Sequence, residues 1–264
     1  MGLIAKKILI TGASRGLGAV AAHAFAKEGA ELTLLSREIN SLENVRYKLD
    51  SPLKHRSIAL DFGKIREWYP ALNEATANSP QTGMVGTMGY FGDLDIVIHC
   101  AGGGLGLKGP YLPAQAFYDL FMLNLGGAAE LNRLIIPAMQ VKGKGTIIHV
   151  CSIASGEAVG SVGYNTCKAA LGAYVRSLGR ELAPFGVVVT GISPGGFRGP
   201  FNAMERLQET HPEAYQEFIQ KRLPRGKMGE AEELIPLLKF LCSEGASMMG
   251  GCLVPVDAGE ARYY

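Results

Sequence analysis

The chain has 264 residues, of which 47% are hydrophobic and 19% are charged. This apolar content can furnish the core of one large domain or two small ones, and it excludes a mostly disordered chain. Lysine and arginine exceed aspartate and glutamate by only 26 − 24 = 2. With no long run of either sign, the charge pattern indicates no nucleic-acid partner.

No stretch approaches the roughly 18 consecutive apolar residues of a membrane-spanning helix, so no membrane association is predicted. Residues 1–6 (MGLIAK) match neither a secretion signal nor a myristoylation site. The five cysteines contain no C-x-x-C pair, which favours reduced thiols and a cytoplasmic location over disulfides or a zinc site. The histidines show no metal-ligand spacing, and we expect no bound metal.

Short runs rich in Ile, Val and Leu alternate with longer segments of helical period. The short runs predict strands at Lys7–Ile10, Leu32–Leu35, Ser57–Leu60, Asp95–His99, Thr146–Val150, Val187–Ile192 and Leu253–Val256. The segments between them predict helices over 17–29, 40–50, 64–77, 114–141, 163–183 and 230–242.

Several of these runs are apolar at nearly every position, as in parallel sheets that are covered on both faces. The repeated strand–helix order predicts an α/β fold: a Rossmann-type doubly wound sheet of about seven parallel strands with helices on both faces. One such sheet uses the whole chain, so we expect a single domain over residues 1–264.

Two segments interrupt this order. Residues 78–92 (NSPQTGMVGTMGYFG) are rich in glycine and form either a binding loop or a tolerated surface insertion. Residues 195–226 hold a predicted helix near 201–222 and are expected to form a substrate lid. The alternative is an amphipathic helix that closes on the body of the protein without contacting substrate.

A glycine-rich turn follows the first predicted strand and precedes the first helix. The sequence Thr11-Gly12-Ala13-Ser14-Arg15-Gly16-Leu17-Gly18 has the spacing G-x-x-x-G-x-G. Glycines let the backbone approach a ligand closely, and the following helix N-terminus offers unpaired N–H groups to a phosphate. The turn therefore predicts a pyrophosphate site that uses Gly12, Ser14, Arg15, Gly16, Leu17 and Gly18.

The end of the second strand indicates which dinucleotide binds. Proteins that bind NAD usually carry an acidic residue there for the ribose 2′-hydroxyl. This chain has Ser36-Arg37 instead, and Arg15 is available from the first turn. Because guanidinium groups pair with phosphates, NADP(H) is predicted. The alternative is that Arg37 is only a solvated charge beside a helix.

Tyr164 and Lys168 lie four residues apart, which places them on one face of a predicted helix. Such a pair is weak evidence alone. Ser152 directly follows a predicted strand, however, and Asn124 lies in the preceding helix. Since open α/β sheets bind ligands at the carboxyl ends of their strands, these four residues form a candidate catalytic group.

Together these motifs resemble the short-chain dehydrogenase/reductase family, in its compact single-domain branch (3-oxoacyl-carrier-protein-reductase-like). The resemblance covers essentially the whole chain. The matching parts, in order, are Thr11–Gly18, Asp61, Cys100-Ala101-Gly102, Asn124, Ser152, Tyr164 with Lys168, Ser193-Pro194-Gly195 and the terminal Pro255-Val256-Asp257-Ala258-Gly259.

The resemblance implies catalytic roles for four residues. Tyr164 would be the general acid that protonates the carbonyl oxygen, or the base in the reverse direction, and Ser152 would hydrogen-bond the same oxygen. Lys168 would hold the nicotinamide ribose and favour loss of the phenol proton, while Asn124 would position a water that relays protons to Lys168.

The same resemblance implies further cofactor contacts. Asp61 would contact the adenine, with the Phe62 amide as a helper, and Pro194-Gly195 would line the nicotinamide pocket. The full set of implied cofactor contacts outside the first turn and Ser36-Arg37 is Asp61, Phe62, Cys100, Ala101, Gly102, Asn124, Tyr164, Lys168, Pro194, Gly195 and Phe197.

Three departures from the family pattern stand out. Ser152 lies one position closer to Tyr164 than the family spacing, so Cys151 is an alternative for its role; we prefer Ser152 because a hydroxyl suits an oxygen ligand. His99-Cys100 replaces the usual Asn-Asn. Gly199 stands where a threonine commonly binds the carboxamide.

The resemblance implies an NADPH-dependent ketoreductase that acts on a small-molecule carbonyl or alcohol and forms a homo-oligomer, a tetramer or a dimer. Two other functions remain open. The chain could be a non-catalytic NADP(H)-binding sensor or scaffold, or a sugar-modifying dehydrogenase of the same family. Aromatic residues in the predicted lid, with Arg198 and Arg206 as possible anchors, suit an acyl thioester or a charged sugar.

Overall fold

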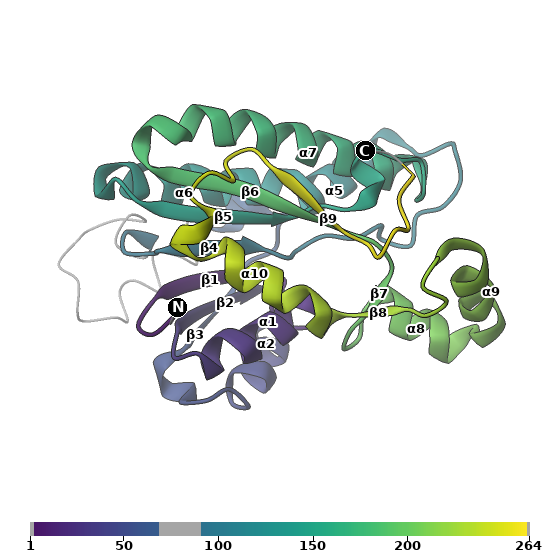
Figure 1. Ribbon diagram of the computed structural model, residues 1–264, viewed down its shortest axis with the longest axis horizontal. Helices are drawn as coiled ribbons and strands as arrows, with labels where there is room; N and C mark the ends of the chain where they lie inside the picture. Colours follow the sequence, from purple (N-terminus) through teal and green to yellow (C-terminus); the bar gives the residue numbers. More distant parts are fainter. Residues whose placement is uncertain (1–2, 69–90, 263–264) are drawn as a thin grey trace.

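The computed structural model of the chain describes residues 3–68 and 91–262. Seven strands form one parallel sheet in the order β3-β2-β1-β4-β5-β6-β9 (Figure 1). Their bounds are β1 Lys7–Thr11, β2 Glu31–Ser36, β3 Arg56–Ala59, β4 Ile96–His99, β5 Gly145–Val150, β6 Val187–Pro194 and β9 Leu253–Val256. The predicted strands and fold class are confirmed.

The strand order reverses between β1 and β4, which are neighbours at the centre of the sheet. The chain first moves outward through β2 and β3 and then returns to β4 on the other side of β1. In open α/β sheets such a reversal leaves a crevice at the carboxyl ends of the strands, where ligands bind.

Helices cover both faces of the sheet (Figure 1). Their bounds are α1 Gly16–Lys27, α2 Ile39–Arg46, α5 Ala114–Phe121, α6 Gly127–Lys142, α7 Val162–Leu182 and α10 Ile235–Leu241. Ile8 and Ile10 of β1 pack with α1 and α10, whereas Leu9 packs in the separate core that α6 and α7 cover. This alternation follows from the two-residue period of a strand.

The predicted helix near 201–222 is two helices. They are α8 Ala203–Thr210 and α9 Pro212–Arg222, and they lie together beyond the end of β6 (Figure 1). The break falls at His211, whose φ of −143° is not helical. Pro212 explains this break, because a proline disfavours helical geometry in the residue before it.

Other helix boundaries also differ from prediction, and the predicted helix over 230–242 begins with the 3₁₀ helix Ala231–Leu234 before α10. The predicted helix over 40–50 ends at Arg46, and Ser51 then adopts a left-handed φ of 56° before Pro52. Of the predicted helix over 64–77, the described part contains the short 3₁₀ helix Ile65–Glu67. The rest of that prediction and most of the 78–92 segment lie outside the described residues.

A second, two-stranded sheet frames the 195–226 segment. It pairs β7 Phe197–Arg198 with β8 Gly229–Glu230, so the chain leaves and re-enters the main body at neighbouring points. Strands of this length show no hydrophobic period, and the sequence did not predict them.

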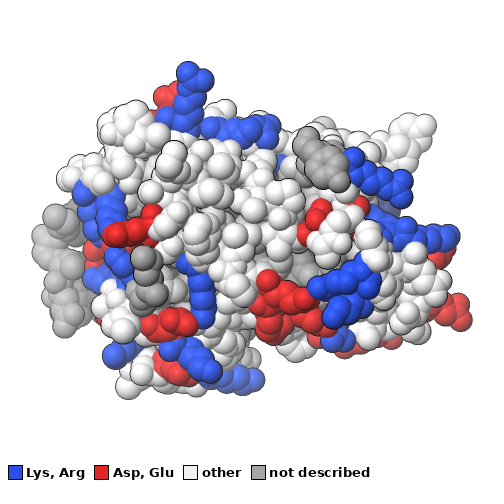
Figure 2. Space-filling model, in the orientation of Figure 1, with Lys and Arg blue, Asp and Glu red and all other residues white. Residues whose placement is uncertain are grey.

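The charged side chains of both signs are mixed over the surface: Figure 2 shows Lys and Arg interspersed with Asp and Glu on the face of the molecule that it draws. No helix among residues 3–68 and 91–262 could cross a membrane.

The packing of α7 against the backbones of Val189 and Gly251 can be tested at Gly179. A Cβ at Gly179 would lie 2.3 Å from the backbone nitrogen of Gly251 and 2.9 Å from the Val189 carbonyl oxygen, neither of which can rotate away. We expect Gly179→Ala to lower the free energy of unfolding by about 1–3 kcal/mol, as overpacking does. Urea unfolding followed by circular dichroism measures the change.

The matched control is Gly250→Ala in the adjoining loop. There the nearest atom to an added Cβ is the Gly179 carbonyl oxygen at 3.7 Å, an ordinary contact. Equal destabilisation by the two substitutions would contradict the close approach of α7 to the 250–251 backbone.

Candidate active site

The turn after β1 brings backbone atoms into contact at two glycines. Gly12 has a left-handed φ of 65°, and a Cβ there would lie 2.8 Å from the Ala101 nitrogen after β4. A Cβ at Gly18 would lie 2.3 Å from the Gly12 carbonyl oxygen. Only glycine fits these positions, so the turn is tight and α1 begins immediately beside the ends of β1 and β4.

The N-terminus of α1 has the features of an anion site. Arg15 precedes the helix in extended conformation, and no side chain caps the first turn. The Gly16 N–H is not open to a ligand, because it donates to the Pro200 carbonyl oxygen at 2.6 Å. Leu17 and Gly18 are buried in the same first turn, and Ser14 is half-buried before it. Pro200 was not among the predicted site residues.

Arginines gather beside this turn. Arg15 and Arg37 are exposed, and the Ser36 hydroxyl donates to the Glu38 carbonyl oxygen at 3.4 Å. Partial burial lowers the pKa of Arg15, and the charges of Arg206 and Arg37 lower it further. Arg206 belongs to α8, so guanidinium groups from two other parts of the chain repel Arg15 here. Such an arrangement favours a bound anion.

After β3, the Asp61 side chain stays partly exposed, whereas the Phe62 side chain is buried. One Asp61 carboxylate oxygen accepts from the Gly63 N–H at 2.8 Å, and the Asp61 side chain is half-buried. Phe62 points into the core, where it lies 5.4 Å from the Trp68 ring and fills the space that a Cβ on Gly127 would need. Only the backbone of Phe62 can therefore serve a cofactor.

Cys100, Ala101 and Gly102 continue from β4 across the crevice. The Ala101 N–H donates to the Thr11 hydroxyl at 3.2 Å. Burial raises the pKa of Cys100 to about 12, despite the opposing charge of Lys168. The thiol therefore stays protonated at neutral pH. A Cβ at Gly102 would lie 3.0 Å from Asn124 Oδ1 and 3.2 Å from Lys168 Nζ, so glycine keeps these groups close.

Asn124 lies in a π-helical turn, Met122–Gly126, between α5 and α6. Its side-chain nitrogen donates to the carbonyl oxygens of Leu120 and Gly103, both at 2.9 Å, and its Oδ1 accepts from the Gly103 N–H at 3.0 Å. The Asn124 amide thus binds the Leu120 carbonyl oxygen of the helix and also fixes the Gly103 backbone after β4. This is a local cause for the π turn, a feature frequent at functional sites.

Lys168 is a buried cation. Only 3% of the residue is exposed, and Nζ donates to the Val150 carbonyl oxygen at 2.9 Å. The half-buried Tyr164 lies on the same face of α7, with Lys168 Nζ 5.7 Å from the centre of its ring. The structure therefore brings Lys168, Tyr164 and Asn124 together as the sequence predicted.

Ser152 begins the 3₁₀ helix Ile153–Ser155 after β5. Its hydroxyl oxygen accepts from the Ala154 N–H at 3.1 Å, which leaves the hydroxyl proton free to donate. Cys151 instead packs with Leu171 and Val175 in the core, where burial raises the pKa of its thiol to about 11. Of the two candidates, Ser152 is the side chain that remains partly open.

The end of β6 leads from the sheet into the 195–226 segment. Pro194 is buried, and the Gly195 N–H donates to the Val256 carbonyl oxygen at 3.2 Å. Phe197 is half-buried and packs against the core that α1 covers. Arg198, expected as a possible substrate anchor, is paired with Glu230 and Gln208 at 2.9 Å each.

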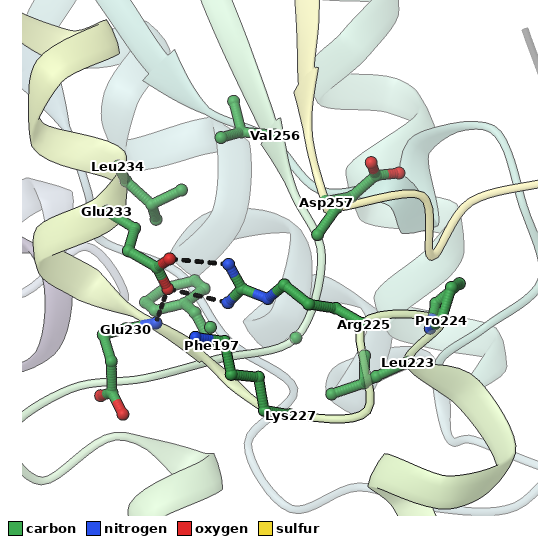
Figure 3. Close-up of a pocket in the computed structure, with 13 residues that line it drawn as sticks. Phe197, Leu223, Pro224, Arg225, Lys227, Glu230, Glu233, Leu234, Val256 and Asp257 are labelled. Atoms are coloured by element: carbon green, nitrogen blue, oxygen red, sulfur yellow. Dashed lines mark hydrogen bonds and ion pairs between the residues drawn. The ribbon is translucent and has the colours of Figure 1, made fainter.

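The segment also borders a small cavity, drawn in Figure 3. Arg225 and Glu233 form a two-pronged ion pair across it, with Nη–Oε distances of 2.7 and 2.8 Å. Its volume of about 80 Å³ is well below the roughly 300–1,000 Å³ of typical ligand pockets. None of Asn124, Ser152, Tyr164 and Lys168 lines it.

Comparison with known proteins identifies the fold family. The family described as short chain dehydrogenase matches residues 6–210 of the chain. The chain belongs to the short-chain dehydrogenase/reductase family. It is therefore an oxidoreductase that binds a nicotinamide cofactor and acts on alcohol or carbonyl groups of small molecules.

Similar proteins include members that act on different substrates. A 2-dehydro-3-deoxy-L-rhamnonate dehydrogenase (NAD(+)) of Sphingomonas is 26% identical over 97% of this chain and 95% of its own. The 3-oxoacyl-[acyl-carrier-protein] reductase FabG of Pseudomonas aeruginosa is 27% identical over 98% of each chain. The structure of L-sorbose reductase from Gluconobacter frateurii, complexed with NADPH and L-sorbose, is 26% identical. It covers 100% of this chain and 99% of its own, with a TM-score of 0.84.

The sequence did not predict several contacts within this family site. Gly103, Val150 and Pro200 act through backbone atoms, which every residue carries, so no residue type marks them. Glu260 is a different case. It is 6% exposed and accepts from the Gly196 N–H at 2.5 Å. In the sequence, a lone glutamate four residues after β9 does not indicate that its side chain is buried or that it binds Gly196.

A buried polar network lies behind the site, directly before Cys100 and Val150. Asn132 Oδ1 accepts from His99 Nε2 at 2.9 Å, and Asn132 Nδ2 lies 3.3 Å from His149 Nε2. The two imidazoles stack with their centres 4.5 Å apart. Among the described residues, no group of His, Cys, Asp and Glu could hold a metal ion.

These histidines generate a prediction about acid stability. Burial lowers the pKa of His99 to about 4 and that of His149 well below its usual 6.5. The folded chain therefore binds fewer protons than the unfolded one, so stability falls as the pH drops from about 6.5 towards 4. His99 alone accounts for a loss of about 3 kcal/mol in the free energy of unfolding. Urea titrations across this range measure it.

His99→Asn is expected to flatten this pH dependence, because the amide does not titrate, and His149→Asn serves if the first variant does not fold. The exposed His23 provides the control, since His23→Asn should leave the dependence unchanged. A wild-type stability that stays constant between pH 6.5 and 4.5 would show that the buried imidazoles are accessible to protons in the folded state.

Proposed function

We propose that this protein is an NADPH-dependent reductase that converts a small-molecule carbonyl into a secondary alcohol, or the reverse, with Tyr164 as the proton donor. One observation carries the proposal. The Lys168 ammonium is buried on the same helix face as Tyr164, next to Asn124 and the end of β5. A buried cation beside a phenol stabilises the phenolate, and this helps the phenol to give up its proton.

The Lys168 charge stabilises the phenolate that remains after Tyr164 has donated. At 5.7 Å from the ring centre and an effective dielectric constant of 20, the attraction is worth about 3 kcal/mol. In bulk water the same pair would gain less than about 1 kcal/mol. The burial of Lys168 is therefore what makes the interaction useful.

The residues around the crevice fit a dinucleotide. The turn leaves no room for a Cβ at Gly12 or Gly18, and no side chain caps the start of α1, which suits a pyrophosphate. Asp61 and the Phe62 amide lie at the end of the strand where the adenine would bind, and Gly102 and Pro194-Gly195 lie where the nicotinamide would. The bound nicotinamide supplies the hydride.

The three arginines support NADP(H) over NAD(H). The charges of Arg37 and Arg206 both act on Arg15, and a 2′-phosphate would offset this repulsion, whereas a ribose hydroxyl would not. The similar L-sorbose reductase is complexed with NADPH, while the similar L-rhamnonate-derivative dehydrogenase uses NAD(+). We therefore base the assignment on this chain's own charges.

Ser152 and Asn124 complete the proposed mechanism. The Ser152 oxygen accepts from the Ala154 N–H, so its own proton remains available to donate to the substrate oxygen that Tyr164 protonates. Asn124 makes three hydrogen bonds, to Leu120 and Gly103, and so fixes the backbone that passes close to Lys168. The 195–226 segment is the proposed lid over this oxygen, because it begins at Gly195 and contacts Gly16 through Pro200.

Replacing Tyr164 with Phe tests the proton donor. The variant keeps the ring but removes the hydroxyl, so we expect carbonyl reduction to fall by at least about 10²–10⁴-fold, the usual worth of a general acid. The NADPH dissociation constant should change less than threefold. NADPH absorbance follows turnover on a panel of L-sorbose, a 3-oxoacyl thioester and cyclohexanone, and NADPH fluorescence follows binding.

The wild-type panel also separates the alternatives. Tight NADPH binding with no turnover of any carbonyl, and none of the corresponding alcohols in reverse, would favour a dinucleotide sensor. Turnover confined to sugars would favour a sugar dehydrogenase. A Tyr164→Phe enzyme that retains full activity would exclude the proposed proton donor.

Replacing Arg37 with Glu tests the cofactor. An acidic side chain repels the 2′-phosphate and can accept a hydrogen bond from a ribose hydroxyl. We expect the affinity for NADPH to fall at least tenfold and that for NADH to stay equal or rise. Titration of both cofactors by fluorescence measures this, with Arg46→Gln, whose guanidinium pairs with Glu43, as the control. A wild-type preference for NADH would overturn the assignment.

A further inference from the structure

The tail after β9 ends in a buried carboxylate. In Figure 1 this tail is the yellow segment that leaves β9 and runs to the C-terminus. The two Asp257 carboxylate oxygens accept from the N–H groups of Gly259 and Ala261, both at 3.0 Å, and so turn the tail back on itself. The turn buries Glu260, which is 6% exposed. Glutamates are rarely buried unless they are paired.

The two oxygens of Glu260 bind two different walls of the proposed pocket. Oε2 accepts from the Gly196 N–H at 2.5 Å, in the turn that follows Pro194. Oε1 accepts from Arg222 Nη2 at 2.6 Å, at the end of α9. A Cβ on Gly195 would lie only 2.6 Å from Oε2, so the glycine after Pro194 is what admits the carboxylate.

Arg222 extends this contact to a third wall. Its other terminal nitrogen donates to the Val159 carbonyl oxygen at 3.0 Å, in the loop that precedes α7. The next residue, Gly160, packs on the catalytic candidate, because a Cβ there would lie 2.8 Å from Tyr164 Cδ1. The Gly160 N–H also donates to Asn165 Oδ1 at 2.9 Å. A continuous set of contacts therefore joins Glu260 to Tyr164.

We propose that Glu260 is a positioning residue, which holds the Gly195–Gly196 turn directly and holds the Val159–Gly160 backbone against Tyr164 through Arg222. It acts on both sides of the place where a carbonyl would meet the nicotinamide, although it touches neither. This proposal rests on the reductase function above. The alternative is that Glu260 only stabilises the fold.

The charge of Glu260 matters because one of its partners is a cation. Burial raises the pKa of Glu260, and the neighbouring carboxylates Asp257 and Glu157 raise it further, while the Gly196 N–H and Arg222 oppose them. Protonation in mild acid would leave the hydrogen bond to Gly196 possible but remove the charge that pairs with Arg222. Glu260→Gln imitates this protonated state at every pH.

Kinetics of Glu260→Gln and Glu260→Ala test the role. We expect kcat for the fastest carbonyl of the panel to fall three- to tenfold in the Gln variant and more than tenfold in the Ala variant. The NADPH dissociation constant should stay within threefold, and circular dichroism at the assay temperature should match wild type. The ratio of wild-type to Gln-variant kcat should fall towards one as the pH is lowered. A purely structural role would not give this pH signature.

Glu244→Gln is the matched control. Glu244 also pairs with a cation, Lys144, at 2.7 Å, but both side chains are more than half exposed and far from the site. Its kcat should equal that of wild type. If both Glu260 variants keep kcat within twofold of wild type, or lose it only in proportion to an unfolded fraction, the positioning role is wrong.

Hydrogen exchange supplies a test that needs no turnover. In Glu260→Ala we expect the Gly160 and Gly196 amides to exchange at least tenfold faster, while amides in β1 keep their rates. Arg222→Lys should accelerate exchange at Gly160 alone, and it replaces the Ala variant if that variant does not fold. Unchanged exchange at both amides overturns the positioning role. Faster exchange in a protein that reduces no carbonyl overturns the reductase function and leaves the positioning contacts established.

Discussion

The arrangement of the candidate active site depends on the positive charge of Lys168, which is kept out of water. Lys168 is almost fully buried, and the hydrogen bond it makes is to a carbonyl oxygen, Val150. Removing an ammonium from water is costly unless an anion or several dipoles replace the water. Among the described residues Lys168 forms no ion pair, and the nearby Cys100 and Cys151 thiols stay protonated because burial raises the pKa of each. Its charge therefore remains available to a ligand or to a phenolate.

Among the described residues, the polar groups around Lys168 are neutral or already hydrogen-bonded to other partners. His99 of β4 and His149 of β5 stack on each other and are held neutral by burial, which lowers the pKa of each, so they neither repel the ammonium nor neutralise it. Asn124 is engaged with the Gly103 backbone on both its oxygen and its nitrogen. A π turn interrupts the helix here and polar groups lie in the core; such departures from regular helix and apolar core are typical of functional sites.

The sequence predicted the parts of this site that depend on residue type and strand order. Seven apolar runs gave every strand of the parallel sheet, because a strand buried on both faces has a composition that turns and helices lack. The positions of Gly12 and Gly18 follow from backbone contacts in which only glycine fits. Tyr164 and Lys168 share a helix face because of their spacing alone.

The remaining features depend on tertiary contacts that no local pattern encodes. The break at His211 is an exception that Pro212 could have shown, and the helical period across 201–222 concealed it. Pro200 and Val150 contribute carbonyl oxygens, and Glu260 becomes important only because the Asp257 turn buries it. Arg198 looked like a substrate anchor but pairs with Glu230 across the β7–β8 sheet, which forms only in the folded chain.

The proposed lid is held at several points, and this limits how the site can open. Pro200 binds the Gly16 amide at its start, the Arg198–Glu230 pair ties β7 to β8 at its base, and Glu260 holds the end of α9 through Arg222. Helices α8 and α9 lie together beyond the end of β6 (Figure 1). These three contacts join the segment to the turn before α1, to β8 and to the tail after β9, so its base is fixed by three separate parts of the chain.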